Sequence, residues 1–250
     1  MEDKIQIVVL AAGFGKRMNN HDLPKVLIPF KGKPIISHLL LAIKESGVGQ
    51  KPVIVIGQKS EMIKSALGPD YTYVFQAEQL GTGHAVSVTK SELEGKAENI
   101  MILYGDHPLV SSLMIKKLAA AHLANQKVLT MATVKVPDFS DWRQSFYDFG
   151  RIFRGDNKLV CQIIEKRDAT QEQKEIKEVN PGYYCFQADW LWSNLDKLKN
   201  DNSQKEYYLT DLVGLACQQG KEIATVEIEP KEALGVNTAE QLALVEKMIN

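Results

Sequence analysis

The first half of this chain alternates short apolar runs, rich in Val and Ile, with segments of helical periodicity. Runs that are apolar on both faces are typical of strands in a parallel sheet that helices cover on each side. The alternation therefore predicts an α/β fold with a doubly wound, mostly parallel sheet, whose ligands bind beyond the carboxyl ends of the strands. The expected strands are Ile5–Ala11, Pro52–Gly57, Asn99–Gly105 and Val128–Val136, and the expected helices are Pro34–Gly47, Ser60–Gly68 and Ser111–Asn125.

The second half carries strand patterns at a different spacing, and no low-complexity linker separates it from the first. We therefore expect one continuous sheet that carries a second lobe. Strands are expected over Gly150–Lys166, as a hairpin, and over Val179–Ala188 and Glu222–Glu229. Helices are expected over Glu206–Lys221 and Thr238–Asn250.

Charge and cysteine content restrict the class of protein. The net charge is −1 and the pI is near 6.5, which argues against a general nucleic-acid binder. Cys161, Cys185 and Cys217 form neither a metal-binding pattern nor an even disulfide framework, so free thiols in a reducing cytoplasm are expected. The N-terminus lacks the apolar core of a signal peptide, and no apolar run approaches the length of a membrane span. The expectation is a cytoplasmic protein without a membrane partner.

A loop with two glycines and nearby cations follows the first expected strand. The Walker A pattern and the third glycine of a dinucleotide-binding fingerprint are both missing, so the glycines alone favour a simple tight turn. Gly13 and Gly15 are, however, followed by Lys16 and Arg17, and Lys25 lies in the same short loop. Three cations around exposed backbone amides predict a cradle for a polyphosphate.

Three more polar motifs lie at the ends of expected elements. Gln76–Ala85 offers amide groups for a nucleobase edge beside a helix N-terminus; alternatively, it is a loop in which Thr82 caps the helix. Asp106 follows a buried strand, where a carboxylate either suits Mg²⁺ or simply caps a turn. His107, beside a proline, favours a structural role, and Asn237 by itself fits a helix N-cap region.

Eight motifs occur in order along nearly the whole chain: LAAGFGKRM with LPKVL, QAEQLGTGHA, LYGDHPL, FGRI, IIEKRDAT, VNPG, EYYLTD and GVNT. Together they resemble the uridylyltransferase domain of the bacterial N-acetylglucosamine-1-phosphate uridylyltransferases, a family of sugar nucleotidyltransferases. The resemblance implies a Rossmann-like (GT-A-like) nucleotide-diphospho-sugar transferase fold with a sugar-binding lobe. It also implies a single domain over residues 1–250, with a nucleotide-binding half (1–110), a sugar-binding half (111–230) and a C-terminal metal-ligand loop and helix (231–250).

The same resemblance implies a role for each motif, with Arg17 and Lys25 as the catalytic cations on the triphosphate. The residues implied to bind the nucleotide are Ala11, Ala12, Gly13, Gly15, Gln76, Gly81 and Thr82. Those implied to bind the sugar are Tyr104, Gly150, Glu165 and Asn180, with Thr82 also meeting it, and those implied to hold Mg²⁺ are Asp106 and Asn237. Without the resemblance, Glu165 also fits a surface ion pair with Lys166 or Arg167.

The implied reaction transfers a uridylyl group from UTP to N-acetylglucosamine 1-phosphate with Mg²⁺ as cofactor, as in nucleotide-sugar biosynthesis for the cell wall. A phosphate monoester has a second pKa of about 6, so the attacking oxygen is already ionised and no general base is required. Catalysis then consists of positioning and charge neutralisation. Open alternatives are another sugar 1-phosphate such as glucose 1-phosphate, CTP or GTP in place of UTP, and a non-catalytic nucleotide-binding module. No oligomeric state follows from the sequence.

Three departures from the family pattern lie near the expected sugar site. Pro181 stands where the family has threonine, Lys205 stands where it has glycine, and the aromatic segment Pro137–Gly150 is longer than expected. We expect these differences to bear on the identity of the sugar more than on that of the nucleotide. The chain also has no hexapeptide repeat, so a left-handed β-helix acetyltransferase domain is not expected.

Overall fold

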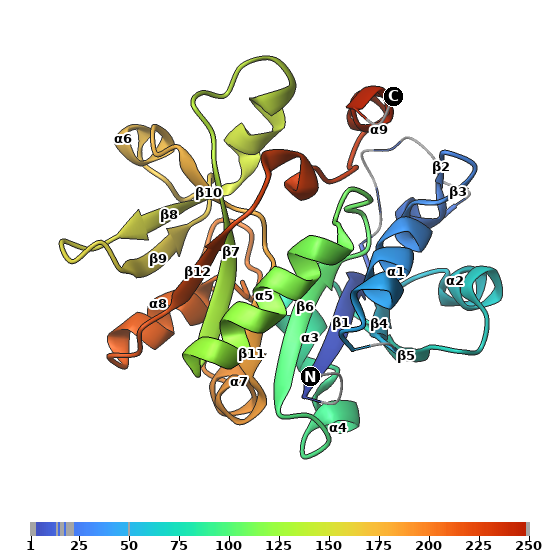
Figure 1. Ribbon diagram of the computed structural model, residues 1–250, viewed down its shortest axis with the longest axis horizontal. Helices are drawn as coiled ribbons and strands as arrows, with labels where there is room; N and C mark the ends of the chain where they lie inside the picture. Colours follow the sequence, from blue (N-terminus) through green and yellow to red (C-terminus); the bar gives the residue numbers. More distant parts are fainter. Residues whose placement is uncertain (1–3, 14, 16–17, 19–22, 50, 249–250) are drawn as a thin grey trace.

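The structure is a computed structural model that describes residues 4–13, 15, 18, 23–49 and 51–248 (Figure 1). The strands of its main sheet are β1 (Ile5–Ala11), β4 (Val53–Ile56), β5 (Thr72–Phe75), β6 (Asn99–Tyr104), β7 (Leu129–Lys135), β8 (Gly150–Arg154), β9 (Val160–Ile164), β10 (Glu178–Asn180), β11 (Tyr184–Gln187) and β12 (Ala224–Glu227). Their order is β5-β4-β1-β6-β11-β7-β10-β8-β9, and β12 pairs with β7. Neighbouring strands from β5 to β6 are parallel, while β11 runs antiparallel to β6 and β7. A separate small hairpin joins β2 (Pro29–Phe30) to β3 (Lys33–Pro34).

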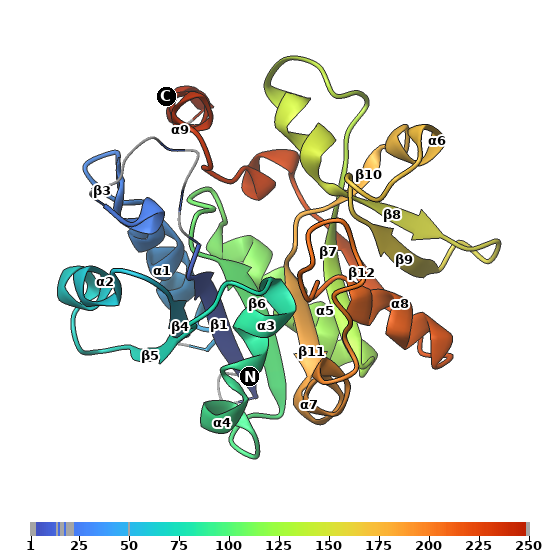
Figure 2. The same ribbon diagram turned by 180° about the vertical axis from the view of Figure 1, so that it is seen from behind.

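Helices cover both faces of the sheet, as the apolar strands predict (Figure 1; Figure 2). The α-helices are α1 (Ile35–Ser46), α2 (Ser60–Leu67), α3 (Thr82–Ser87), α4 (Lys90–Leu93), α5 (Ser112–Asn125), α6 (Gln171–Lys174), α7 (Ala188–Leu195), α8 (Asp211–Gln218) and α9 (Ala239–Met248). The 3₁₀ helices are η2 (Lys25–Leu27), η3 (Asp141–Asp148) and η4 (Pro230–Ala233). Alternate residues of β1 enter opposite cores: Ile7 and Val9 pack with α1 and α5, whereas Val8 and Leu10 pack with α3 and α7. The doubly wound, parallel-dominated sheet is therefore confirmed.

Local signals located several element ends correctly. β1 has the predicted bounds, Ile5–Ala11. α1 ends before Gly47, whose φ of 65° lies in the left-handed region that glycine adopts without a steric penalty. α5 begins after Ser111, whose Oγ accepts a hydrogen bond of 3.1 Å from the backbone N–H of Met114.

The segment Val179–Ala188, expected as one strand, is divided into β10 and β11 at Pro181–Tyr183. Pro181 has no N–H to donate to a ladder, and Gly182 adopts a φ of 87°. The chain changes partner at this point, because β10 pairs with β8 whereas β11 pairs with β6. Both strands also pair with β7, so the change does not interrupt the sheet.

The helix expected over Glu206–Lys221 begins only at Asp211, as α8. The residues before it run along the loop that leads into α3 instead. The backbone N–H of Tyr207 donates to the carbonyl of Leu80 over 2.7 Å, and the N–H of Gly83 donates to the carbonyl of Tyr207 over 2.8 Å. Helical periodicity cannot reveal such a pairing, because the partner lies more than a hundred residues away in the chain. The sequence also failed to predict α7.

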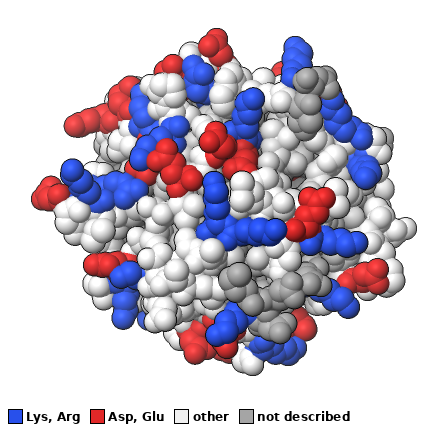
Figure 3. All heavy atoms as spheres, in the orientation of Figure 1, with Lys and Arg blue, Asp and Glu red and all other residues white. Residues whose placement is uncertain are grey.

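The described helices include none that is long and apolar enough to cross a membrane. Lys and Arg side chains are interspersed with Asp and Glu over the face shown in Figure 3. This mixture agrees with the net charge of −1 and with the prediction that the protein is not a general nucleic-acid binder.

A buried histidine predicts a pH-dependent stability. Nε2 of His122 donates to Oδ1 of Asn99 over 3.0 Å, and Nδ1 lies 2.9 Å from the hydroxyl of Thr130, which donates to it. Burial lowers the pKa of His122 to about 4, whereas an unfolded histidine has a pKa of about 6.5. Between these values only the unfolded state binds the proton, so the free energy of unfolding falls as pH falls. We expect a loss of about 2–3 kcal/mol from this group.

Denaturant unfolding at neutral pH and at about pH 4.5 measures this loss in the wild-type protein and in His122→Gln. Glutamine does not titrate, so the variant should lose less stability between the two conditions. Equal losses in both proteins would show that His122 is not the responsible group.

Candidate functional site

Two adjoining cavities lie beyond the carboxyl ends of β1 and β6, where a doubly wound sheet binds its ligand. Their volumes are about 200 Å³ and about 240 Å³. Thr82, Tyr104 and Glu206 line both, so the two spaces meet at these side chains. The predicted residues that line the first cavity are Ala11, Ala12, Gly13, Lys25, Gln76, Gly81, Thr82, Tyr104 and Asp106. Those that line the second are Thr82, Tyr104, Gly150, Glu165 and Asn180.

Three predicted residues are absent from both linings. Arg17 lies outside the described residues, and Asn237 accepts a hydrogen bond from Lys25. Gly15 adopts a φ of 63°, and a Cβ atom at this position would lie 2.8 Å from Cβ of Lys25. A glycine here therefore lets the first loop pass close to Lys25.

Lys25 lies at the centre of the polar contacts of the first cavity. Its Nζ donates to Oδ2 of Asp106 and, over 2.8 Å, to Oδ1 of Asn237. The side chains of Lys25 and Asp106 are only 12% and 11% exposed. The three residues come from η2, the loop after β6 and the loop before α9. The N–H of Val236 donates to the carbonyl of Asp106 over 2.9 Å, and this bond joins the last two loops.

The charge of Asp106 depends on this contact. Burial by itself raises the pKa of Asp106, but the charge and the hydrogen bond of the Lys25 ammonium outweigh burial and hold the pKa below its usual range. Asp106 is therefore a carboxylate at neutral pH. Its oxygen and the amide oxygen of Asn237 converge on one cation, a donor set that also suits a hard divalent cation. The described residues hold no group of three or more His, Cys, Asp or Glu that could bind a metal.

His107 lines the second cavity, and its contacts agree with the structural role that the sequence favoured. Its Nδ1 lies 2.5 Å from the hydroxyl of Tyr183, and that hydroxyl donates to the carbonyl of Glu232 over 2.8 Å. Nδ1 of His107 is therefore the donor in the first bond. Its ring stacks on Tyr104 with centroids 5.5 Å apart, and burial lowers its pKa, so it stays neutral. His107 thus supports the loop that carries Asp106.

Gln76 is almost fully buried in the wall of the first cavity. Its Nε2 lies 3.0 Å from Nδ1 of His84 and 3.4 Å from the carbonyl oxygen of Gly81. Since a carbonyl oxygen only accepts, the amide nitrogen of Gln76 is directed at these two partners. Oε1 of Gln76 is thereby left as the group that can accept from a ligand.

The loop after Gln76 is held by the segment that precedes α8. A Cβ atom at Gly81 would lie 2.6 Å from the carbonyl oxygen of Tyr207, and the φ of Gly81 is 107°, so this position requires glycine. Oγ1 of Thr82 accepts from the N–H of Leu209 over 3.0 Å. α3 has no side-chain cap, so the alternative interpretation of Thr82 as a helix cap is wrong.

Glu165 lines the second cavity. Its Oε1 accepts from the hydroxyl of Thr210 over 3.0 Å, and burial raises its pKa. Lys166 pairs with Asp148. Among the described residues, the alternative surface ion pair of Glu165 with Lys166 or Arg167 is not formed.

The other walls of the second cavity depend on glycines. A Cβ atom at Gly182 would lie 2.5 Å from the ring of Tyr104, and one at Gly150 would lie 2.7 Å from Cγ2 of Ile163. Oδ1 of Asn180 accepts from the N–H of Gly182 over 3.0 Å and so holds the turn after β10. Close backbone approach at these two glycines brings the walls of the cavity together.

Sequence reasoning missed Glu206. This carboxylate lines both cavities, and burial raises its pKa. It was expected only as the first residue of the helix Glu206–Lys221. The signal that could have found it is the EYYLTD motif, which begins at Glu206.

Residues 7–208 match the family of MobA-like NTP transferase domains. The chain belongs to this family. It is 40% identical over 244 residues to the bifunctional protein GlmU of Brevibacillus brevis, covering 97% of this chain and 51% of that protein. It is 37% identical over 249 residues to GlmU of Desulfotalea psychrophila, and the match covers 98% of this chain and 70% of that protein. The resemblance predicted from the eight motifs is thus confirmed, and the chain spans about half the length of most of these relatives.

Solved structures agree with the fold of this MobA-like NTP transferase. A UDP-glucose pyrophosphorylase complexed with UDP-glucose superposes with a TM-score of 0.75 at 18% identity, covering 100% of this chain and 98% of the other. An apo UDP-glucose pyrophosphorylase gives a TM-score of 0.77 at 18% identity, with 98% of each chain covered. At this identity the likeness establishes the nucleotide-sugar transferase fold.

The contact between Gly182 and Tyr104 makes the junction of the two cavities sensitive to a single methyl group. Gly182→Ala places a left-handed φ on alanine and a Cβ atom against the Tyr104 ring, so we expect the free energy of unfolding to fall by about 2–3 kcal/mol. Gly220→Ala is the matched control, because Gly220 has a φ of 68° and open space where its Cβ would lie. The control should lose only about 1 kcal/mol. Equal losses in urea unfolding would mean that the ring contact costs nothing.

Proposed function

We propose that this chain transfers a uridylyl group from UTP to N-acetylglucosamine 1-phosphate, giving UDP-N-acetylglucosamine and pyrophosphate. The observation that carries the proposal is the pair of cavities that meet at Thr82 and Tyr104, with Lys25 and Asp106 in the wall of the first. Two separate spaces suit a nucleotide and a sugar. The cavities meet at Tyr104, which precedes Asp106 by two positions in the chain, so the reacting phosphate groups would lie near Asp106.

Gln76 supports uracil as the base. Its amide nitrogen is directed at His84 and Gly81, so its oxygen is left to accept a hydrogen bond. Uracil carries an N–H at position 3 that can donate to this oxygen, whereas cytosine carries an unprotonated nitrogen there. The backbone of Ala11 and Gly13 lines the same cavity and would complete the nucleotide site.

Mg²⁺ is the proposed cofactor, and Asp106 and Asn237 are the residues that would hold it. Their oxygens already converge on the Lys25 ammonium, so they fit a single cation. Mg²⁺ takes few protein carboxylates and relies on substrate phosphates for further ligands. When bound, it would supply positive charge to those phosphates. Lys25, released from Asp106, would then donate to phosphate oxygens.

In the proposed reaction, an oxygen of the sugar phosphate attacks the α-phosphorus of UTP. A new bond forms between that oxygen and the α-phosphorus, and the bond from the α-phosphorus to pyrophosphate breaks. The attacking phosphate is already ionised near neutral pH, so the chain has to position and neutralise two polyanions. Lys25 and Arg17 are proposed to stabilise the departing pyrophosphate.

The division of the chain is part of the same proposal. The first cavity is lined mainly by residues of the half 1–110, and the second mainly by residues of the half 111–230. The segment 231–250 contributes Asn237. A cytoplasmic location is also proposed, and the three free cysteines are consistent with a reducing compartment.

Initial rates of pyrophosphate release test this function, with UTP, CTP, GTP and ATP each paired with N-acetylglucosamine 1-phosphate and with glucose 1-phosphate. We expect UTP with N-acetylglucosamine 1-phosphate to give the highest kcat/KM. A missing acetamido group leaves polar groups of the site unpaired and should lower kcat/KM by about ten- to a hundredfold. A preference for glucose 1-phosphate or CTP would replace the proposed substrates. No release with any pair would favour a non-catalytic nucleotide-binding module.

Asp106→Asn should lower turnover by at least about a hundredfold, because it removes charge from the site where charge has to be balanced. Binding of Mn²⁺ in the presence of UTP, followed by electron paramagnetic resonance, should weaken in the same variant. Circular dichroism should show that the fold is retained. Wild-type turnover in excess EDTA would contradict the role given to Asp106.

A further inference from the structure

Arg151 is a fully buried cation that the proposed reaction does not use. It lies on β8, directly after Gly150, and none of its side chain is exposed. Its Nε donates to the carbonyl of Lys174 over 3.1 Å, and its Nη2 donates to the carbonyl of Tyr147 over 3.1 Å. Its Nη1 donates to the carbonyl of Phe149. Among the described residues, no carboxylate forms an ion pair with it.

The three carbonyl partners belong to the carboxyl ends of two short helices. Tyr147 lies in the last turn of η3, Phe149 follows η3, and Lys174 is the last residue of α6. Such carbonyls have no partner within their own helix and carry partial negative charge. The planar guanidinium donates to all three at once. The ring centroids of Phe139 and Tyr147 lie 4.7 Å and 5.3 Å from Cζ of Arg151, so two aromatic rings also contact the guanidinium.

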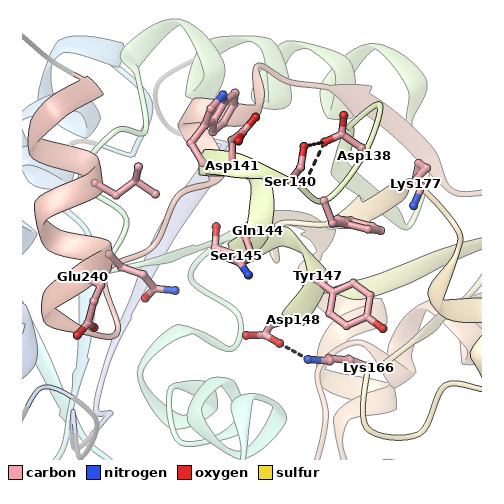
Figure 4. A pocket seen from close by; sticks show the side chains of 14 residues that line it. Asp138, Ser140, Asp141, Gln144, Ser145, Tyr147, Asp148, Lys166, Lys177 and Glu240 are labelled. Carbon is pink, nitrogen blue, oxygen red and sulfur yellow. Dashed lines mark hydrogen bonds and ion pairs between the residues drawn. The ribbon is translucent and has the colours of Figure 1, made fainter.

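The segment that Arg151 holds separates two spaces. Asp148, Phe149 and Gly150 line the second cavity of the site. On its other side, the segment that contains η3 lines a groove of about 780 Å³, shown in Figure 4. Asp148 lines both spaces and bonds to Lys166 between them. The position of this wall therefore sets the size of the second cavity.

The strand register connects Arg151 to the other two walls. Arg151 lies opposite Val179 of β10 and opposite Ile164 of β9. Each of these residues directly precedes a proposed sugar-binding residue, Asn180 and Glu165. A displacement of β8 at Arg151 would therefore disturb all three sides of the second cavity.

We propose that Arg151 is a positioning residue that determines the acceptor specificity of this enzyme. By holding the carbonyl ends of η3 and α6, it fixes the wall formed by residues 148–150 against the sugar. This inference rests on the proposed function, because it takes the second cavity as the sugar site. None of the described residues that line the first cavity belongs to the Arg151 network. Affinity for UTP is therefore independent of Arg151.

Steady-state kinetics of Arg151→Met and Arg151→Lys test the inference. In Arg151→Met three partly buried carbonyls lose their donor, and KM for N-acetylglucosamine 1-phosphate should rise about ten- to a hundredfold. KM for UTP should stay within about threefold of the wild-type value. The preference over glucose 1-phosphate should shrink as well. Arg151→Lys should rescue part of the effect, since one ammonium cannot reproduce the guanidinium fork. If the Met variant does not fold, the Lys variant carries the test.

Arg154→Met is the matched control on the same strand. Arg154 donates to both carboxylate oxygens of Glu178, over 2.8 Å and 2.7 Å, and lines neither the second cavity nor the groove. It should lose stability without a change in KM for the sugar phosphate. Wild-type KM values for the sugar phosphate in folded Arg151 variants would overturn this inference alone. Absence of turnover in the wild-type protein would overturn the proposed function as well.

Discussion

The ammonium group of Lys25 joins parts of the chain that are otherwise remote. Its two acceptors, Asp106 and Asn237, lie 81 and 212 positions further along the sequence. Because the pair of Lys25 with Asp106 is largely removed from water, loss of either partner would leave an uncompensated charge in a medium of low dielectric. His107, next to Asp106, holds the Asp106 loop through its contacts with Tyr183 and Tyr104. The Lys25 ammonium and the side-chain oxygens of Asp106 and Asn237 can therefore interact with ligands that carry negative charge or bring a cation.

The second cavity has a different physical origin, a change of partner within the sheet. The chain leaves β10 and enters β11 through Pro181 and Gly182, and this turn lies against the Tyr104 ring. If β10 and β11 formed one continuous strand, its side chains would fill the space of the second cavity. Proline, which cannot donate to a ladder, and glycine, which adopts the left-handed φ, make the interruption possible. The second cavity is therefore a product of backbone geometry as much as of side-chain chemistry.

The sequence predicted features that depend on local pattern and missed those that depend on distant partners. β1 and the end of α1 at Gly47 follow from apolar runs and a glycine stop, and both are observed. The glycine loop, Gln76 and Asp106 were located by their positions after strands. The start of α8 was misplaced, because Glu206 and its neighbours pair with the loop before α3. Arg151 belongs to the FGRI motif, but the motif did not reveal its contacts, because the carbonyl of Lys174 reaches it only through the fold and the carbonyls of Tyr147 and Phe149 only through the local turn of η3. Most of the predicted residues thus line the two cavities, but the contacts that hold them could not be predicted.

The most direct test of the account follows the oxygen atoms of the sugar phosphate. N-acetylglucosamine 1-phosphate labelled with ¹⁸O on its phosphate is incubated with UTP, and the products are examined by ³¹P nuclear magnetic resonance. If the sugar phosphate attacks the α-phosphorus of UTP, all of the label appears in UDP-N-acetylglucosamine, including the bridge between its two phosphorus atoms. Pyrophosphate then remains unlabelled. Label in pyrophosphate, or release of UMP without a sugar nucleotide, would contradict the account.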